Sequence, residues 1–246
     1  MSDPVTVALL VGATFAAAGF VKGVAGLGLP TVAMGLLSLI MAPAAAATLL
    51  VVPSLLTNFW QLLSGPKLAA LVHRLATMML AVLAGTALGI NVLTGSSAGL
   101  AQTALGAILA LYGVFGLTVR GFSVPPRAEW WLSPVVGLVT GAITGATGIF
   151  AIPAVPYLHS LDLPKDELIQ ALGLSFTVST IGLAAALTAV GKYELAAAGN
   201  SLLAVVPALL GMHLGRLVRD KLSPERFRRW FFIGLVALGL YMLLRA

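Results

Sequence analysis

The chain has 246 residues, of which 59% are hydrophobic and only 9% are charged. A soluble domain carries about 25% charged residues, so this composition excludes a soluble globular protein and indicates an integral membrane protein. In such a protein the net charge of +6 reports which loops face the cytoplasm rather than binding to nucleic acid, and the absence of cysteine excludes disulfides and thiolate sites.

Ten apolar stretches rich in Ala, Leu and Gly follow one another along the chain. They show no ten-residue pattern of alternating polarity, so we expect membrane-spanning helices rather than the strands of a barrel. The start lacks the basic segment of a cleaved signal, so the first stretch is predicted to be a retained helix. In chain order the stretches lie at about 5–21, 28–41, 44–64, 69–92, 98–118, 131–149, 151–160, 167–190, 195–215 and 227–244.

Two of these stretches, 28–41 and 151–160, are shorter than the roughly 20 residues that a span needs. Each is predicted to form, with the segment before it, either a broken helix or a hairpin that enters the membrane and returns. The glycine-rich strings Gly19–Pro30 and Gly141–Pro153 stand at these places, and clustered Gly and Pro interrupt helices. Interrupted segments at corresponding places in two halves of a chain indicate the binding site of a transporter.

The glycines also indicate a duplication. Gly19, Gly23 and Gly26 precede Gly141, Gly145 and Gly148 by 122 positions, and a later set of three keeps an offset of 126 (Gly65, Gly85 and Gly89 with Gly191, Gly211 and Gly215). We therefore predict a first membrane repeat over 1–120, a cytoplasmic linker over 121–129 and a second repeat over 130–246. Each repeat would consist of the broken helix or hairpin followed by three spanning helices.

The second repeat is expected to have inverted topology, because three crossings leave the chain on the opposite side of the membrane. The charges agree with this expectation: the loop 216–229 is basic, whereas its counterpart 91–98 is uncharged. Of the 14 basic residues, 11 fall in loops opposite the N-terminus, which the positive-inside rule places in the cytoplasm. We therefore predict a multi-pass protein of the cytoplasmic (inner) membrane with both termini outside.

All eight acidic residues fall in predicted loops or at helix ends, so no carboxylate is expected to relay protons within the membrane. An anion suits the chain better. Helices that restart near Gly28–Thr31 and Gly148–Ile152 would present free N–H groups and positive dipole ends. Lys22 lies within the first string, where a transported anion would supply its counter-charge. Its alternative role is to extend from a helix end to water.

The next helix of each half carries polar residues at one spacing, with Ser54, Asn58 and Gln61 matched by Ser175, Ser179 and Gly182. Such groups line a cavity or hydrogen-bond between helices. The three histidines stand far apart, so we expect no metal, and nothing indicates a cofactor. The predicted substrate-binding residues are Lys22, Gly26, Gly28, Pro30, Thr31, Ser54, Asn58, Gln61, Thr144, Thr147, Gly148, Pro153, Ser175, Thr177 and Ser179.

The chain resembles the sulfite exporter TauE/SafE family of membrane permeases over nearly its whole length. The resemblance is carried by Gly19–Pro30 with Leu36-Leu37, by Gly141–Pro153 with Val155-Pro156-Tyr157-Leu158, and by Gln170–Ser179. It implies an all-helical permease, not an enzyme, for sulfite, for sulfonates such as taurine or sulfoacetate, or for related organosulfur and carboxylate anions. The implied partners are a small anionic substrate and the lipid bilayer.

The membrane potential gives the expected transport a direction. Outward movement of one negative charge is favourable by about 2.3 kcal/mol per 100 mV, so we predict export by alternating access without a coupling ion. The alternatives are a small-anion channel or a carboxylate permease of the same fold, and a non-transporting subunit. An intramembrane serine protease is disfavoured because no histidine is predicted in the middle of a span. The identity of the anion, the coupling and the formation of a homo-oligomer stay open.

Overall fold

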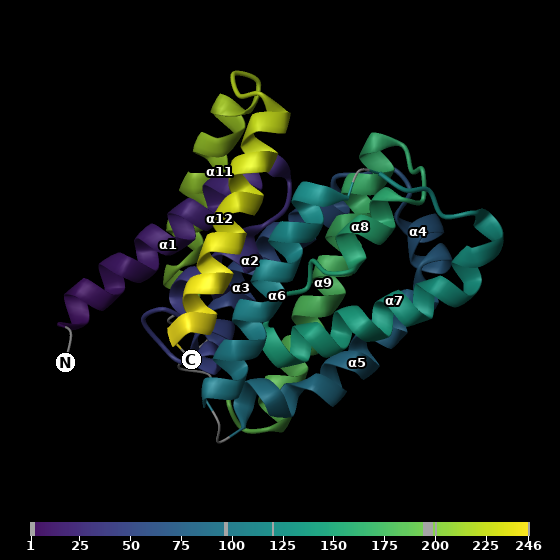
Figure 1. Cartoon of the computed structure of the whole chain (residues 1–246). Coiled ribbons are helices and arrows are strands. Elements are labelled where there is room, and N and C mark those ends of the chain that lie inside the picture. Colours follow the sequence, from purple (N-terminus) through teal and green to yellow (C-terminus); the bar gives the residue numbers. More distant parts are fainter. Residues whose placement is uncertain (1–2, 96–97, 120, 194–198, 200, 246) are drawn as a thin grey trace.

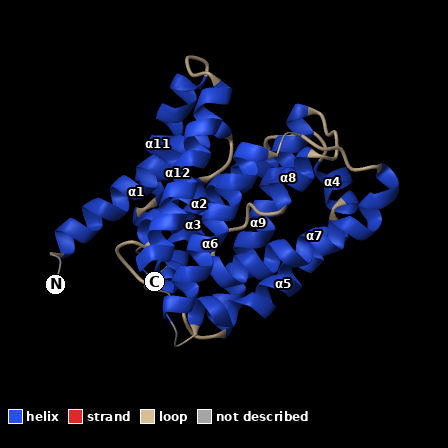
Figure 2. Cartoon of the chain, in the orientation of Figure 1, coloured by secondary structure: helices blue, strands red, loops and turns tan. Residues whose placement is uncertain are grey.

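The computed structural model describes residues 3–95, 98–119, 121–193, 199 and 201–245, and this part of the chain consists of helices joined by loops (Figure 2). The first half contains α1 (Pro4–Ala25), α2 (Leu29–Leu37), α3 (Pro43–Leu63), α4 (Leu68–Arg74), α5 (Ala76–Thr94) and α6 (Ala98–Thr118). The second half contains α7 (Pro126–Thr147), α8 (Ala154–His159), α9 (Lys165–Ala189), α11 (Val205–Arg219) and α12 (Pro224–Arg245).

Seven helices within the described residues are long and apolar enough to cross a membrane: α1, α3, α5, α6, α9, α12 and the segment Ser201–Arg219 that contains α11. The protein is therefore a multi-pass membrane protein. The two most buried of these helices, α3 and α9, pack against each other. In Figure 1 they lie between the α1–α11 pair on the left of the view and the α5–α7 pair at the lower right.

Several boundaries differ from the sequence-based expectation. The stretch 69–92 is divided at Leu75 into α4 and α5. Helix α7 starts at Pro126 rather than at 131, because proline is pre-organised for the first helical position, so the end of the expected linker 121–129 is helical. Residues 194–198 and 200, at the start of the stretch predicted over 195–215, lie outside the described residues, and α11 extends to Arg219.

Both predicted helix breaks are confirmed. Helix α1 ends at Gly26, with φ of 75°, and α2 begins after Gly28, with φ of 100°; α7 ends at Gly148, with φ of 73°. Glycine adopts this left-handed conformation without the steric cost that a Cβ imposes. We call Gly26–Gly28 the first break and Gly148–Pro153 the second break.

The restart after the second break differs from the prediction. Helix α8 begins at Ala154 and has six residues, whereas a start near Gly148–Ile152 was expected. The backbone after Gly148 instead hydrogen-bonds to threonine side chains of α7. The Ile149 N–H donates to Thr147 Oγ1 over 3.2 Å, and the Ile149 carbonyl accepts from Thr144 Oγ1 over 3.3 Å. Because these peptide groups are already bonded to α7, the chain stays non-helical up to α8.

Glycines let helices of one half approach helices of the other at backbone distance. A Cβ added to Gly23 on α1 would lie 2.3 Å from the Met212 carbonyl oxygen on α11. The equivalent contact on α7 joins Gly145 to the Thr86 carbonyl oxygen of α5, also at 2.3 Å. The same holds for Gly19 with Ala208 and for Gly141 with Val82, both at 2.1 Å. The four most extensive helix pairs, α1–α11, α5–α7, α6–α12 and α3–α9, each join one half to the other.

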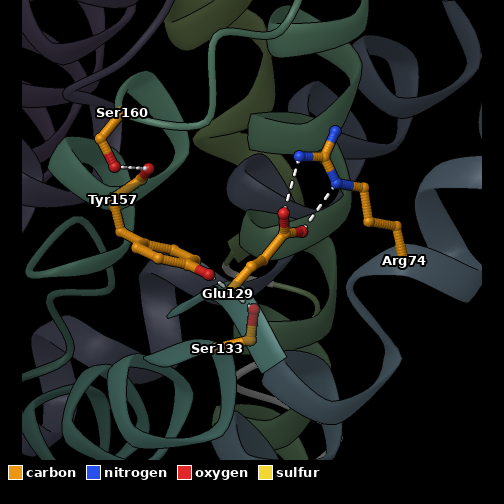
Figure 3. A network of polar contacts seen from close by, with 5 residues as sticks. All are labelled: Arg74, Glu129, Ser133, Tyr157 and Ser160. Atoms are coloured by element: carbon orange, nitrogen blue, oxygen red, sulfur yellow. Dashed lines mark hydrogen bonds and ion pairs between the residues drawn. The ribbon is translucent and has the colours of Figure 1, made fainter. Parts of the chain in front are cut away.

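A polar network fixes α8 against its neighbours (Figure 3). Arg74 at the end of α4 forms a two-pronged ion pair with Glu129 in the first turn of α7, at 2.7 and 2.8 Å. One helical turn further, Ser133 Oγ lies 2.7 Å from the Tyr157 hydroxyl of α8, and Ser160 Oγ donates to the Tyr157 carbonyl over 2.6 Å. Paired hydrogen bonds of this kind specify geometry as well as contributing energy, so the network orients the end of the second break.

Candidate functional site

Lys22 lies in the last turn of α1 and its side chain is buried, with 5% of the residue exposed. Its ammonium group donates to Thr57 Oγ1 over 3.1 Å and to Asn58 Oδ1. Both acceptors belong to α3. The Lys22 cluster, as we call Lys22, Thr57 and Asn58, therefore joins the first break to the buried centre of the molecule.

Every partner of the Lys22 ammonium within the described residues is electrically neutral. In this part of the chain the one ion pair is Arg74–Glu129, and it lies at another site. An ammonium group has three N–H donors, of which the Lys22 cluster occupies two. A lysine at the centre of a membrane helix is unfavourable by about 2.5–3.5 kcal/mol without compensation. The cluster thus has both a donor and a positive charge for an anion.

A proline shapes α3 next to this cluster. Pro53 has no N–H, so the carbonyl of Leu49 loses its helical partner. Ser201 replaces that partner: its hydroxyl donates to Leu49 O over 2.6 Å and accepts from Val52 N–H over 3.3 Å. Thr57 Oγ1 in turn donates to the Pro53 carbonyl over 2.8 Å, which orients its oxygen lone pair toward Lys22.

The cluster continues into α9. The Asn58 side-chain amide donates to Thr180 Oγ1 over 3.5 Å, so one asparagine contacts both α1 and α9. Asn58 and Thr180 are almost completely buried. Three helices from the two halves of the chain therefore meet at Asn58.

Four of the predicted site residues carry buried hydroxyl groups that have no hydrogen-bond partner among the residues that the structure describes. They are Thr31, Ser54, Ser175 and Ser179; Ser38 and Thr140 share this property. A buried polar group left unpaired is unfavourable by about 1–3 kcal/mol. Ser54 belongs to α3, one helical turn before Asn58, and Ser179 precedes Thr180 on α9. Hydroxyls in this state are available to donate to the oxygens of a ligand.

The second break contacts the helix that follows the first break. A Cβ on Gly148 would lie 2.9 Å from Met34 Sδ of α2, the helix that restarts after the first break. Thr31 lies in the first turn of α2 and is fully buried. The first backbone donor of α2 that has a helical partner is Val32 N–H, which bonds to Gly28 O over 2.9 Å, and Pro30 has no N–H. The N–H groups of Leu29 and Thr31 thus stand at the positive end of α2.

Other predicted residues have local or structural partners. Gln61 lies one turn beyond Asn58 and donates to the Ile169 carbonyl over 3.1 Å, so it ties α3 to α9. Thr144, Thr147 and Thr177 each donate to a backbone carbonyl four residues earlier in their own helix. Thr144 stands 122 positions after Lys22, so the repeat places a charge in the first half only. Gly26, Gly28 and Gly148 form the breaks; Pro30 follows the first break and Pro153 ends the second.

Sequence reasoning missed two residues of this site, Thr57 and Thr180. The prediction selected polar residues at helical spacing on one face of α3 and α9, and Thr57 directly precedes Asn58, about 100° around the helix. Thr57 donates to the carbonyl four residues earlier, as Thr144, Thr147 and Thr177 also do, so this contact gives no separate signal for the site. No single-helix pattern indicates that Thr180 faces Asn58.

Comparison with known proteins agrees with this geometry. Neither the curated proteins nor the solved structures contain a match to the chain. A protein-family model described as "Sulfite exporter TauE/SafE" matches residues 10–242. That range includes both breaks, the Lys22 cluster and all or most of each candidate span. Because the match covers nearly the whole chain, the protein belongs to the sulfite exporter TauE/SafE family and is a transmembrane transporter of sulfur compounds rather than an enzyme.

Proposed function

We propose that the protein exports small sulfur oxyanions or organosulfur anions, such as sulfite and sulfonates, and that the Lys22 ammonium is the charged group that binds them. The observation that carries this proposal is a buried lysine whose partners in the described structure are all neutral. Anions bound at such a site replace the missing counter-charge, and the low dielectric of the surroundings strengthens the attraction.

Uncharged donors on α2, α3 and α9 fit the same ligand class. Sulfite and sulfonate groups carry three oxygens that accept hydrogen bonds on several sides. Ser54, Ser175, Ser179 and Thr31 have buried hydroxyls without a partner among the described residues, and α2 presents its positive end at the first break. A site with one lysine and several hydroxyls binds a compact oxyanion without the carboxylates that a cation site requires.

We further propose that the halves are inverted-topology repeats. Reciprocal contacts support a two-fold relation: Gly23 of α1 meets α11 as Gly145 of α7 meets α5. We propose that α1 and α2 together enter and leave the membrane on the same side. The three candidate spans that follow the first break (α3, α5 and α6) then make the number of crossings odd, which inverts the second half. The α11–α12 turn lies at the top of Figure 1, and the marked termini lie lower in the view.

Alternating access in this arrangement would move helix pairs rather than sequence halves. The α1–α11 and α5–α7 pairs are in backbone contact through glycines and each contains one helix from each half. Rocking one half against the other would separate these contacts. We propose that each pair moves as a unit relative to α3 and α9. Asn58 on α3 and Ser179 on α9 would thereby come to lie on alternate sides of the site.

Export driven by the membrane potential gives a direct test. Vesicles are loaded with sulfoacetate, and a potential of 100 mV is imposed that is negative on the side of the α11–α12 turn. This potential should raise the equilibrium ratio of the sulfoacetate concentration on the positive side to that on the negative side. The shift is about fortyfold per net charge, because 100 mV corresponds to about 2.3 kcal/mol and tenfold to about 1.4 kcal/mol. Flux is measured by isotope release after a potassium diffusion potential is imposed.

Taurine provides the control, since it carries a sulfonate and an ammonium group and has no net charge near neutral pH. If taurine is transported, its distribution should not respond to the potential. Sulfoacetate flux that is equally indifferent to the potential would contradict uncoupled export. Flux at channel rates, without saturation, would favour the channel alternative.

The orientation has its own test, which the absence of cysteine makes simple. Lys192 and Ser223 are exposed and lie beyond opposite ends of the Ser201–Arg219 span. In intact cells a membrane-impermeant maleimide should label Lys192→Cys and leave Ser223→Cys unlabelled until the cells are opened. The reverse pattern would place the basic loop outside and would contradict the predicted orientation.

A further inference from the structure

Two cavities lie side by side, apart from the Lys22 cluster. The first cavity has a volume of about 440 Å³ and lies among the α1–α2 connection, α6, α8 and the α11–α12 region. The second has a volume of about 290 Å³ and lies between the α6–α7 connection, α7 and α8. They share Phe115, Phe122 and Pro156 as walls, so these three residues stand between two adjoining chambers.

The first cavity is positively charged. Arg219 at the end of α11 and Arg228 on α12 line it together with His159, and no acidic residue of the described chain is among its lining residues. Neither arginine makes an ion pair within the described residues. Partial burial and the nearby Arg228 charge hold the pKa of His159 below its usual value, so the positive charge near pH 7 comes from the two arginines.

The second cavity is apolar. Val124, Leu132, Val136 and Ile152 line it, and its one polar side chain, Tyr157, has its hydroxyl bonded to Ser133. The walls shared between the chambers are aromatic and partly exposed, with Phe115 at 36% and Phe122 at 47%. A compact anion such as sulfite would leave this chamber unfilled. An amphiphile would place a charged head in the first cavity and a hydrocarbon chain in the second.

We propose that these two chambers bind an anionic phospholipid, with its phosphate between Arg219 and Arg228 and one acyl chain past Phe115 and Phe122 into the second cavity. Basic pockets between membrane helices on the cytoplasmic side bind anionic lipid headgroups in this way. The cytoplasmic placement depends on the orientation proposed above, whereas the binding itself does not depend on the transported substrate. The lipid bridges α6, α8 and α12 next to the first break.

The test measures lipid binding to the purified full-length protein by native mass spectrometry and by the thermal unfolding midpoint. The probes are dioleoyl phosphatidylglycerol, dioleoyl phosphatidylcholine, dihexanoyl phosphatidylglycerol and inorganic phosphate. We expect the dioleoyl anionic lipid to bind most tightly. Arg219→Gln/Arg228→Gln should weaken it about thirtyfold, since each arginine near an anionic lipid surface contributes about fivefold.

Arg226→Gln/Arg229→Gln is the matched control, because it removes the same charge from the same basic region without touching the cavity. This variant should bind phosphatidylglycerol as the unmodified chain does. Equal weakening by both double variants would overturn the proposal in favour of diffuse surface attraction. Equal binding of phosphatidylcholine, or replacement of the lipid by inorganic phosphate, would overturn it as well.

A second variant tests the acyl chamber independently of the arginines. Val136→Phe adds bulk to the second cavity and should abolish the preference for dioleoyl over dihexanoyl phosphatidylglycerol while leaving binding of the short lipid unchanged. An unchanged preference would contradict the assignment of the chain to this cavity. Displacement of the long lipid by sulfoacetate would overturn the proposal, because it would make the cavity a part of the transport path.

Discussion

Replacement of Lys22 by methionine should abolish anion binding and transport without unfolding the protein. Removing one partner of a buried, hydrogen-bonded charge pair weakens binding by about 2 kcal/mol or more, which is about thirtyfold. The fold should tolerate Lys22→Met because a buried charge with only neutral partners in the described structure gives way to an apolar side chain of similar length. Binding of sulfite and sulfoacetate by calorimetry, flux in vesicles and the unfolding midpoint are the measurements.

Lys67→Gln is the control for charge, since Lys67 is exposed at the start of α4 and its backbone, not its side chain, contacts Gln170. It should transport normally. Asn58→Asp is a second test variant. A carboxylate at the Asn58 position would give Lys22 a permanent partner and would therefore compete with the substrate. Transport should fall while the unfolding midpoint stays the same or rises. Wild-type affinity in Lys22→Met would refute the proposed site.

Substitution of Gly23 by alanine should destabilise the protein strongly although it adds only one methyl group. The new Cβ would lie 2.3 Å from the Met212 carbonyl oxygen and 3.0 Å from Gly215 Cα, so α1 and α11 have to move apart. Overpacking of this kind is unfavourable by about 1–3 kcal/mol, which lowers the unfolding midpoint by about 5 °C for a chain of this size. The midpoint is measured by differential scanning fluorimetry in detergent.

Gly12→Ala is the matched control in the same helix, because no atom lies within 4 Å of the position of its Cβ. It should leave the midpoint unchanged or raise it, as alanine favours a helix over glycine. Gly145→Ala should repeat the effect of Gly23→Ala through its contact with Thr86. Similar midpoints for Gly12→Ala and Gly23→Ala would show that α1 and α11 are not held at backbone distance.

Much of the fold follows from local features of the sequence. Membrane helices are read from hydropathy because each must satisfy its own backbone within the lipid. The breaks are equally local: Gly26, Gly28 and Gly148 take positive φ angles, which glycine alone adopts without strain. Boundaries such as the division at Leu75 were less predictable, since no glycine or proline marks the division.

The candidate site likewise has features that follow from single residues and features that depend on the tertiary structure. Composition and spacing identified Lys22 and Asn58 as costly residues to bury, and that cost is a property of each residue alone. The pairing of the Lys22 ammonium with Thr57 and Asn58, and of Asn58 with Thr180, was decided by the tertiary structure, because it brings together residues more than 30 and more than 120 positions apart. The hydrogen bond from Gln61 to the Ile169 carbonyl was also decided by the tertiary structure.

The sequence by itself determined that this protein lies in a membrane and where its helices break, since hydrophobicity and glycine conformation act over a few residues. Only the tertiary structure decided that Lys22 is buried against α3, which helices pair between the halves and which buried hydroxyls have no partner among the described residues. It also placed two cavities side by side near α6 and α8. These features depend on the close approach of backbones through glycine pairs such as Gly23 with Gly215, which no single helix encodes.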